Sequence, residues 1–176
     1  MPIFARGVTK NKLTILYYAR ASDLDITREQ LYRAMIENDC MSYFDFQPAM
    51  NELEEDGYIA AIPRAFGQGY RVSARGADTL TMFEKSLQIS LRDRLDAYAR
   101  ENREAMRRET QYTTGMEEQR SGGYRVYLKA QEQSTVVLGI DILLASRDMA
   151  KRARKNWELA SSDIYGYLLE KLLKDS

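Results

Sequence analysis

The sequence predicts an α+β fold built in two parts, residues 1–84 and residues 85–176. In the first part, apolar residues recur at helical spacing in three segments, and two short strand-like segments follow them. In the second part, a long helical pattern precedes three alternating segments that are joined by short turns. These three observations predict helices followed by a hairpin, and then an antiparallel sheet with covering helices.

The first two helices have clear boundaries. Residues 11–20 carry apolar side chains at spacings of three and four, which predicts an amphipathic helix. Thr27 is a suitable N-cap for the second helix, and Gln30 lies three residues later, as in a capping box. Asn38-Asp39 is expected to end this helix.

The third helix is expected to begin at Asp45 as its N-cap, after a turn through Ser42-Tyr43. Pro48 then falls in the first turn, where its missing N–H costs little, and Gly57 lies just past the end. The predicted buried face consists of Phe46, Ala49, Met50 and Leu53.

Two strands are predicted directly after this helix, at residues 58–62 and 70–73, with a turn-rich segment between them. Three helices followed by a short hairpin is the element order of a winged helix-turn-helix domain. The second and third helices would form the turn motif, and the hairpin would form the wing.

The remaining chain predicts helix, sheet and helix. A helical pattern runs from Ala74 to Met106, with a break at Ser86 or Ser90. Three adjacent alternating segments favour an antiparallel meander, and the tail is helical again from Met149 to Leu172. We expect this part to serve as a dimerisation or regulatory domain.

Composition excludes several function classes. The chain has no histidine and one cysteine, Cys40, so a Ser-His-Asp triad, a Cys-His pair and a His-containing or four-cysteine zinc site are excluded. No carboxylate pair or glycine-rich phosphate loop stands in a catalytic arrangement. We therefore expect no enzyme, no cofactor and no metal, and we expect Cys40 to be a small buried side chain; the alternative is a reactive thiol.

The net charge of the chain is zero, but the charged residues are unevenly distributed along the sequence. There are 26 basic and 26 acidic residues, yet residues 1–84 hold nine Lys and Arg against twelve Asp and Glu. DNA-binding domains usually carry a basic footprint, so this acidic half argues against DNA binding. No apolar run approaches the ~20 residues that span a bilayer, and the start of the chain lacks the apolar core of a signal peptide. A cytoplasmic location without membrane contact is expected.

The candidate DNA-reading residues lie on the third helix. Gln47 and Asn51 are four residues apart on the face opposite the buried one, and amide side chains can pair with adenine in the major groove. Ser42 and Tyr43 precede the helix, where their hydroxyls could reach a phosphate. The alternatives are a plain polar helix surface and a tyrosine packed in the core.

Basic residues around the predicted wing and first helix are candidate phosphate contacts, with isolated surface charges as the alternative. They are Arg64, Arg71, Arg75, Lys10 and Lys12.

Three features of the second part have competing interpretations. The basic segment Lys151–Lys155 is either a nucleic-acid patch or, more simply, a solvated helix face. Asp141 is expected to point outward from an apolar strand. A small-molecule effector has no support beyond three sheet tyrosines that could line a pocket or pack against helices: Tyr112, Tyr124 and Tyr127.

Several segments occur in a characteristic order: Asn11–Tyr18, Met41–Phe44, Asn51–Leu53, Asp56–Ile59 and Val72–Leu80. This ordered set resembles an uncharacterised bacterial winged-helix family that is catalogued as a domain of unknown function. The resemblance runs on through Trp157 to Ile164-Tyr165 and so covers most of the chain. It implies a winged-helix regulator and supplies no catalytic residues.

The leading interpretation is a DNA-binding transcriptional regulator that binds double-stranded DNA as a homodimer. The rival interpretation is a protein-interaction module, in which an acidic winged helix without DNA binding docks on another protein.

Overall fold

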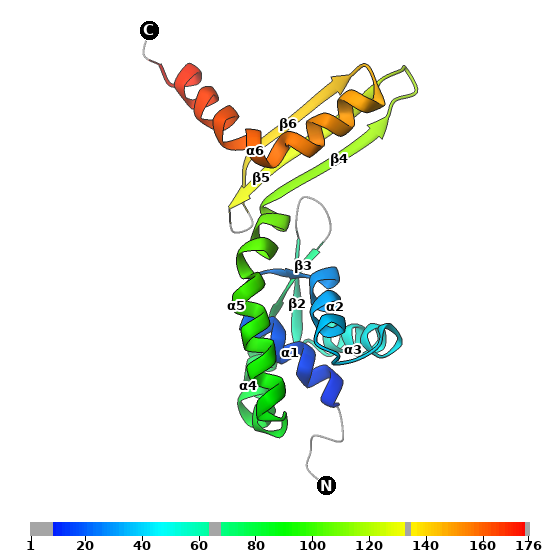
Figure 1. Cartoon of the computed structure of the whole chain (residues 1–176), viewed down its shortest axis with the longest axis vertical. Coiled ribbons are helices and arrows are strands. Elements are labelled where there is room, and N and C mark those ends of the chain that lie inside the picture. Colours follow the sequence, from blue (N-terminus) through cyan, green and yellow to red (C-terminus); the bar gives the residue numbers. More distant parts are fainter. Residues whose placement is uncertain (1–8, 64–67, 133–134, 175–176) are drawn as a thin grey trace. The chain divides into compact units, whose positions relative to one another are not determined.

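The computed structural model describes residues 9–63, 68–132 and 135–174. The chain divides into two compact units, residues 1–107 and residues 108–176 (Figure 1). Each unit has a three-stranded antiparallel sheet and its own buried core. In the described residues, no helix is long and apolar enough to cross a membrane.

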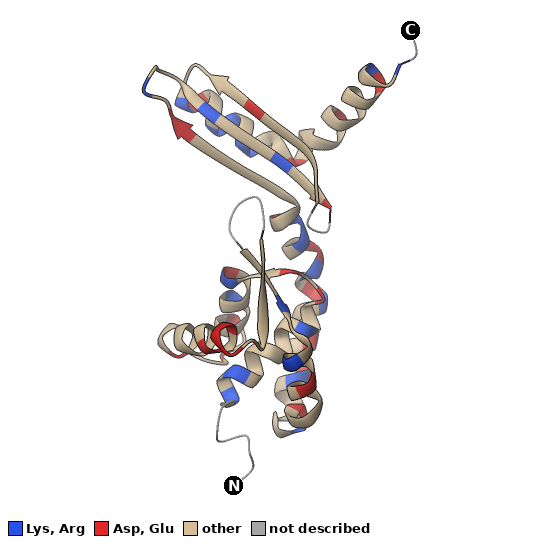
Figure 2. Ribbon diagram, turned by 180° about the vertical axis from the view of Figure 1, so that it is seen from behind, with Lys and Arg blue, Asp and Glu red and all other residues tan. Residues whose placement is uncertain are grey.

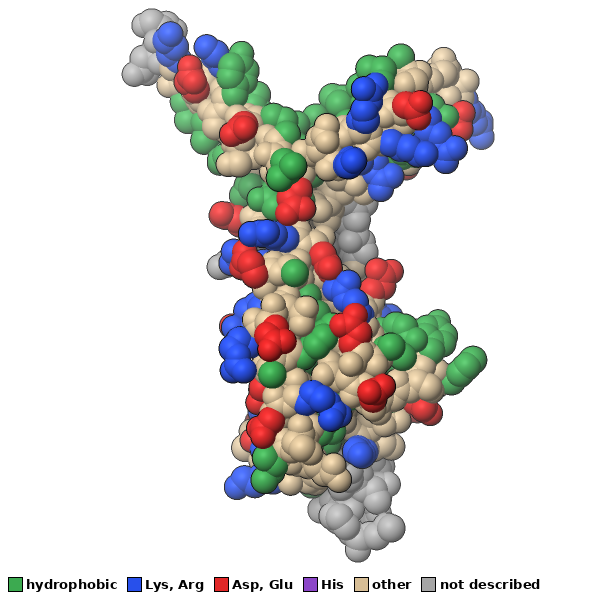
Figure 3. Space-filling view, viewed as in Figure 1, with side chains coloured by type: hydrophobic (Ala, Val, Ile, Leu, Met, Phe, Trp, Pro, Cys, Tyr) green, Lys and Arg blue, Asp and Glu red, His purple; other side chains and the backbone are tan. Residues whose placement is uncertain are grey.

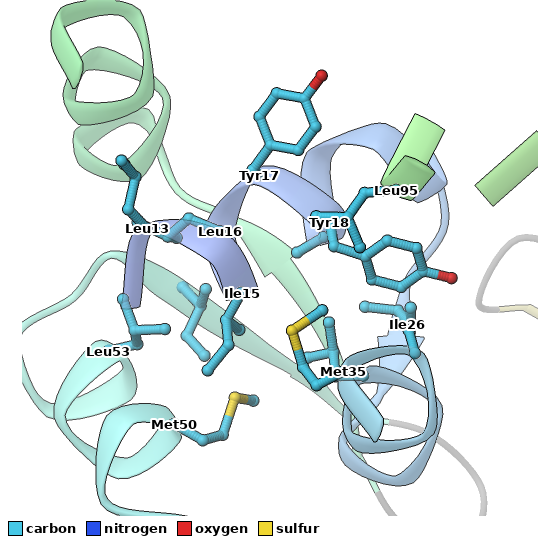
Figure 4. Close-up of a cluster of buried hydrophobic side chains, with 14 of the residues drawn as sticks. Leu13, Ile15, Leu16, Tyr17, Tyr18, Ile26, Met35, Met50, Leu53 and Leu95 are labelled. Atoms are coloured by element: carbon cyan, nitrogen blue, oxygen red, sulfur yellow. The ribbon is translucent and has the colours of Figure 1, made fainter. Parts of the chain in front are cut away.

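The first unit is built around α1 (Lys10–Ser22), which is buried on almost every side. The side chains of α2, α3 and α5 point toward it: Met35, Met50, Leu53 and Leu95 surround α1 in Figure 4. A helix that is apolar around most of its circumference must be enclosed by other elements, which explains its central place.

The helices around α1 begin at well-defined caps. Thr27 and Gln30 form the expected capping box at the start of α2 (Arg28–Glu37), and Asn38 follows its end. The expected start of α3 is wrong. Ser42 is the N-cap of α3 (Tyr43–Glu55), because its hydroxyl accepts the backbone N–H of Asp45 at 3.3 Å. Pro48 therefore lies beyond the first turn.

The sheet of the first unit has the order β1-β3-β2. Strands β2 (Ile59–Pro63) and β3 (Gln68–Val72) form the predicted hairpin, and Gly57 precedes it with a φ of 73°. The short strand β1 (Ile26–Thr27) pairs with Tyr70 and Gly69 and was not predicted, because two residues carry no alternating pattern.

The helices that follow the hairpin also belong to the first core. α4 (Ala74–Phe83) and a 3₁₀ turn (Glu84–Ser86) lead into α5 (Ile89–Gln111), so a break occurs at Ser86 as expected. Leu91, Leu95, Ala99 and Met106 of α5 are buried in this core. The compact unit therefore extends to Arg107, past residue 84, where the sequence interpretation ended the first part.

The second unit is a meander with the order β4-β5-β6, as expected. Its strands are β4 (Tyr112–Glu118), β5 (Tyr124–Glu132) and β6 (Thr135–Leu144). The helix α6 (Arg147–Leu172) covers one face, where Val126, Leu128, Ala150 and Trp157 form the core. The indole Nε1 of Trp157 donates to the backbone oxygen of Lys129 at 2.9 Å, which anchors α6 to β5.

Candidate nucleic-acid interface

The outward face of α3 carries the candidate reading residues. Burial of Phe46, Ala49, Met50 and Leu53 turns the opposite side of the helix toward solvent. Asn51 is exposed and Gln47 is half-buried on this side. Ser42 is exposed at the helix start, where its hydroxyl also donates to the Oδ2 of Asp45 at 2.7 Å.

Arg28, the first residue of α2, joins the two amides. Its Nη2 donates to the Oε1 of Gln47 at 2.8 Å and to the Oδ1 of Asn51 at 2.5 Å. These hydrogen bonds hold the side-chain oxygens of Gln47 and Asn51 toward the guanidinium of Arg28. Sequence reasoning missed Arg28, because its contacts with Gln47 and Asn51 depend on how α2 packs against α3.

Lys12 is not presented to solvent. Only 6% of its side chain is exposed, and its ammonium group forms an ion pair with Glu52 and lies 3.8 Å from the Oδ2 of Asp56. A phosphate would have to displace these carboxylates to contact it. Lys10, the first residue of α1, is exposed.

The two described arginines near the hairpin have acceptors within the first unit. The guanidinium of Arg71 is paired with the Oδ1 of Asp25, through Nε at 2.8 Å and Nη2 at 2.6 Å. Arg75 donates from Nη1 to the backbone oxygen of Asp56 at 2.6 Å and lies 4.5 Å from the ring centre of Tyr58. Arg64 lies outside the described residues.

Six of the predicted residues thus fall into two groups. Tyr43, Gln47 and Asn51 lie on α3 and Ser42 caps it, and Arg28 of α2 binds Gln47 and Asn51. Lys12 and Arg75 both meet Asp56, the residue that ends α3. Their charges offset acidic residues there and are not directed at the reading face.

The charged residues of α3 are all acidic. The helix contains Asp45, Glu52, Glu54 and Glu55 and no lysine or arginine. Figure 2 shows acidic residues gathered toward its carboxy-terminal end. A carboxylate at that end opposes the helix dipole, so the nearby cations relieve an unfavourable arrangement.

An aromatic cluster adjoins the start of α3. Tyr43 contacts Tyr32 edge to face, with ring centres 5.3 Å apart, and it also contacts Phe44 at 6.0 Å. Phe44 is 85% exposed and Tyr43 is 49% exposed. Hydrophobic side chains accordingly reach the molecular surface at the α3 edge in Figure 3.

Outside this interface, the described residues offer few metal-binding or reactive groups. No group of three or more potential His, Cys, Asp or Glu ligands occurs among the described residues. Burial raises the pKa of the Cys40 thiol, whose Sγ donates to the backbone oxygen of Asn38 at 3.6 Å. The pKa of Tyr17 is raised to about 12, mainly by burial and next by a hydrogen bond to Asp96.

The three sheet tyrosines do not face one space, so the pocket interpretation is wrong. Tyr112 and Tyr124 pack against the core beneath α6. Tyr127 lies on the other face of β5, where its hydroxyl donates to Glu117 at 3.3 Å. Asp141 is exposed on that face and pairs with Arg125 at 2.8 Å, as its outward orientation predicted.

Comparison with known proteins identifies one relationship. The model of a family described as a domain of unknown function, DUF4364, matches residues 11–172. This match confirms the resemblance to a domain of unknown function. No curated protein and no solved structure matches the chain.

Proposed function

The chain belongs to the DUF4364 family, and we propose that it is a DNA-binding transcriptional regulator of winged-helix type that acts as a homodimer. The observation that carries the proposal is the convergence of Arg28, Gln47 and Asn51 between α2 and α3. These three side chains combine a cation that suits phosphate or guanine with two amides that suit adenine.

We assign α2 and α3 to the turn motif, with α3 as the recognition helix, and β2–β3 to the wing. The element order and the antiparallel pairing of the hairpin support this assignment. In such domains the recognition helix enters the major groove, and its amino-terminal residues contact base edges. Gln47 and Asn51 lie on the exposed side of that helix.

Arg28 would give the reading face its positive charge. A guanidinium has five N–H donors, and the two amide oxygens engage one of its nitrogens. The other donors can bind a phosphate while the amides stay oriented. The Ser42 hydroxyl would have to exchange its hydrogen bond to Asp45 for one to a DNA phosphate.

Two copies of the domain would read two half-sites, which compensates for the weak affinity expected of an acidic recognition helix. A bacterial regulator of this kind works in the cytoplasm, where its DNA lies.

A second function is favoured by a separate observation. Phe44 is 85% exposed at the start of α3, and the charge of Lys12 is already neutralised by Glu52. An exposed aromatic side chain at the start of a helix without lysine or arginine suits a protein partner better than a phosphate backbone. The second candidate is therefore a protein-interaction module built on the same helices.

Fluorescence anisotropy with a pool of genomic DNA fragments at low salt tests the first function. We expect Asn51→Ala to reduce discrimination between sites by about 1–3 kcal/mol. Arg28→Ala should weaken binding to all fragments and lower the salt slope by about one unit. The matched control is Gln88→Ala, which removes an exposed amide outside α2, α3 and the hairpin.

The two candidates give opposite outcomes. If no fragment binds at micromolar dimer, or if both variants bind like the control, the DNA-reading role fails. Phe44→Ser should leave DNA binding largely intact under the first function and abolish partner binding under the second.

A further inference from the structure

The last turns of α6 extend past the sheet that covers the rest of the helix. We call residues 162–173 the arm. Ser161, just before it, is only 3% exposed, whereas Leu172 and Leu173 are 75% and 72% exposed. Figure 1 shows this end of α6, coloured red, projecting beyond the strands of the second unit.

The apolar stripe of α6 continues along the arm, where Tyr165 and Leu172 are exposed and Leu168 is half-buried. At 3.6 residues per turn, Tyr165, Leu168 and Leu172 share the face on which Trp157 and Ser161 are buried. From Ser161 onward the stripe has spacings of four, three and four, which is the pattern of a helix–helix seam. Ile164 still packs against the sheet core, so the uncovered part begins at Tyr165.

The opposite face of the arm is polar. Asp163 and Glu170 lie about half a turn away from the stripe, together with Gly166. Tyr167 and Leu173, which are 60% and 72% exposed, lie outside the stripe, so the apolar surface of the arm is wider than one helix face. Hydrophobic side chains are visible along the arm in Figure 3.

We infer that the arm is the surface through which a second copy of this chain binds. The inference deepens the homodimer in the proposed function by naming its interface. A twofold contact needs a surface that is complementary to itself, and an apolar stripe with balanced charges meets that need. The arm carries the acidic residues Asp163 and Glu170 and the basic residue Lys171, and Lys174 follows it. These four charges sum to zero, so two arms approach without net repulsion.

The charge argues against a lipid surface as the occupant. Helices that lie on membranes carry an excess of Lys and Arg on the polar face. Here the polar face opposite the stripe carries the carboxylates of Asp163 and Glu170. A second arm fits this surface and an anionic bilayer does not.

The area suggests a reversible dimer. Of the side chains on and beside the stripe, Leu172 is 75% exposed, Tyr165 and Leu169 are about 40% exposed, and Leu168 is half-buried. Two arms would therefore bury an interface smaller than the ~1,000 Å² of a stable complex. We therefore expect dissociation as the protein is diluted through the micromolar range.

Sedimentation velocity of the full chain over a concentration series tests the inference. We expect the wild type to reach the dimer mass at micromolar concentration, and the double variant Leu168→Ser/Leu172→Ser to stay a monomer. The matched control is Leu159→Ser. Leu159 lies on the same helix and is 85% exposed, but it stands off the stripe, so this variant should dimerise like the wild type.

Each outcome decides the inference. A wild type that stays monomeric at every concentration overturns it, and so does a double variant that dimerises normally. An unchanged circular dichroism spectrum and melting temperature would show that the double variant remains folded. Since no DNA is present, a dimer that binds no fragment would leave the interface standing while the DNA-binding proposal fails.

Discussion

The side-chain amide of Gln30 donates from Nε2 to the backbone oxygen of Met106 at 3.0 Å, which ties the start of α2 to the last turns of α5. The same side chain accepts the backbone N–H of Thr27 through Oε1 at 3.1 Å. Tyr18 adds a contact from α1, because its hydroxyl donates to the Sδ of Met106 at 3.4 Å. One glutamine thus completes a helix cap and a long-range link beside Arg28.

Replacing Gln30 with alanine should lower the free energy of unfolding by about 1–3 kcal/mol, since it removes hydrogen bonds in a buried place. Gln30 is only 3% exposed. Urea unfolding measures the change, and Gln88→Ala, at an exposed glutamine, should stay within about 0.5 kcal/mol of the wild type. Equal effects of the two substitutions would contradict the importance of this link.

Gly76→Ala should destabilise the first unit by about 1–3 kcal/mol through overpacking. A Cβ at this position would lie 2.1 Å from the backbone oxygen of Tyr58, and backbone cannot move aside cheaply. Gly166→Ala is the control, because nothing lies within 4 Å of its Cβ and alanine favours helix. The melting temperatures of both variants test this prediction. A Gly76→Ala protein as stable as the control would show that α4 shifts freely.

The free energy of unfolding should fall as the pH rises from 10.0 toward 12, in part through Tyr17. Its folded-state pKa, about 12, lies above the ordinary value, so folding holds the phenolic proton more tightly than the unfolded chain does. The contribution is complete below the unfolded pKa and is lost as the pH passes the folded one. Tyr17→Phe should flatten this part of the urea-unfolding profile. An unchanged slope would contradict the assignment.

Cys40 should react slowly with a thiol reagent at neutral pH. Burial raises the pKa of its thiol, so the thiolate that attacks the reagent is scarce. Because it is the only cysteine in the chain, the absorbance change on reaction with Ellman's reagent reports this site alone. The urea-unfolded chain should react many times faster. Equal rates would mean that the native thiol is open to solvent and ionised.

Local sequence signals predicted much of the fold. The capping box at Thr27 and the place of Gly57 just past the third helix depend on neighbours in the chain, and both were confirmed. The predicted start of α3 was wrong because serine and aspartate are equally good N-caps, and the sequence offers both at Ser42 and Asp45. The serine is the cap, and with it Tyr43 enters the helix and contacts Tyr32.

The candidate site was harder to predict, because its contacts join distant segments. Lys12 and Glu52 are forty residues apart, and their ion pair leaves no mark on the local pattern. The pairing of Arg71 with Asp25 is equally invisible in the sequence. Gln47 and Asn51 were recognisable from helical spacing alone, whereas Arg28 required the packing of α2 against α3.

The most direct test of the central claim is to map backbone amide shifts by NMR while the chain is titrated with a DNA fragment selected from the pool. DNA reading by α3 predicts that the largest changes fall on residues 42–51 and on Arg28. Changes that leave these residues untouched and cluster on Lys151–Lys155 of α6, or that occur nowhere, would contradict it.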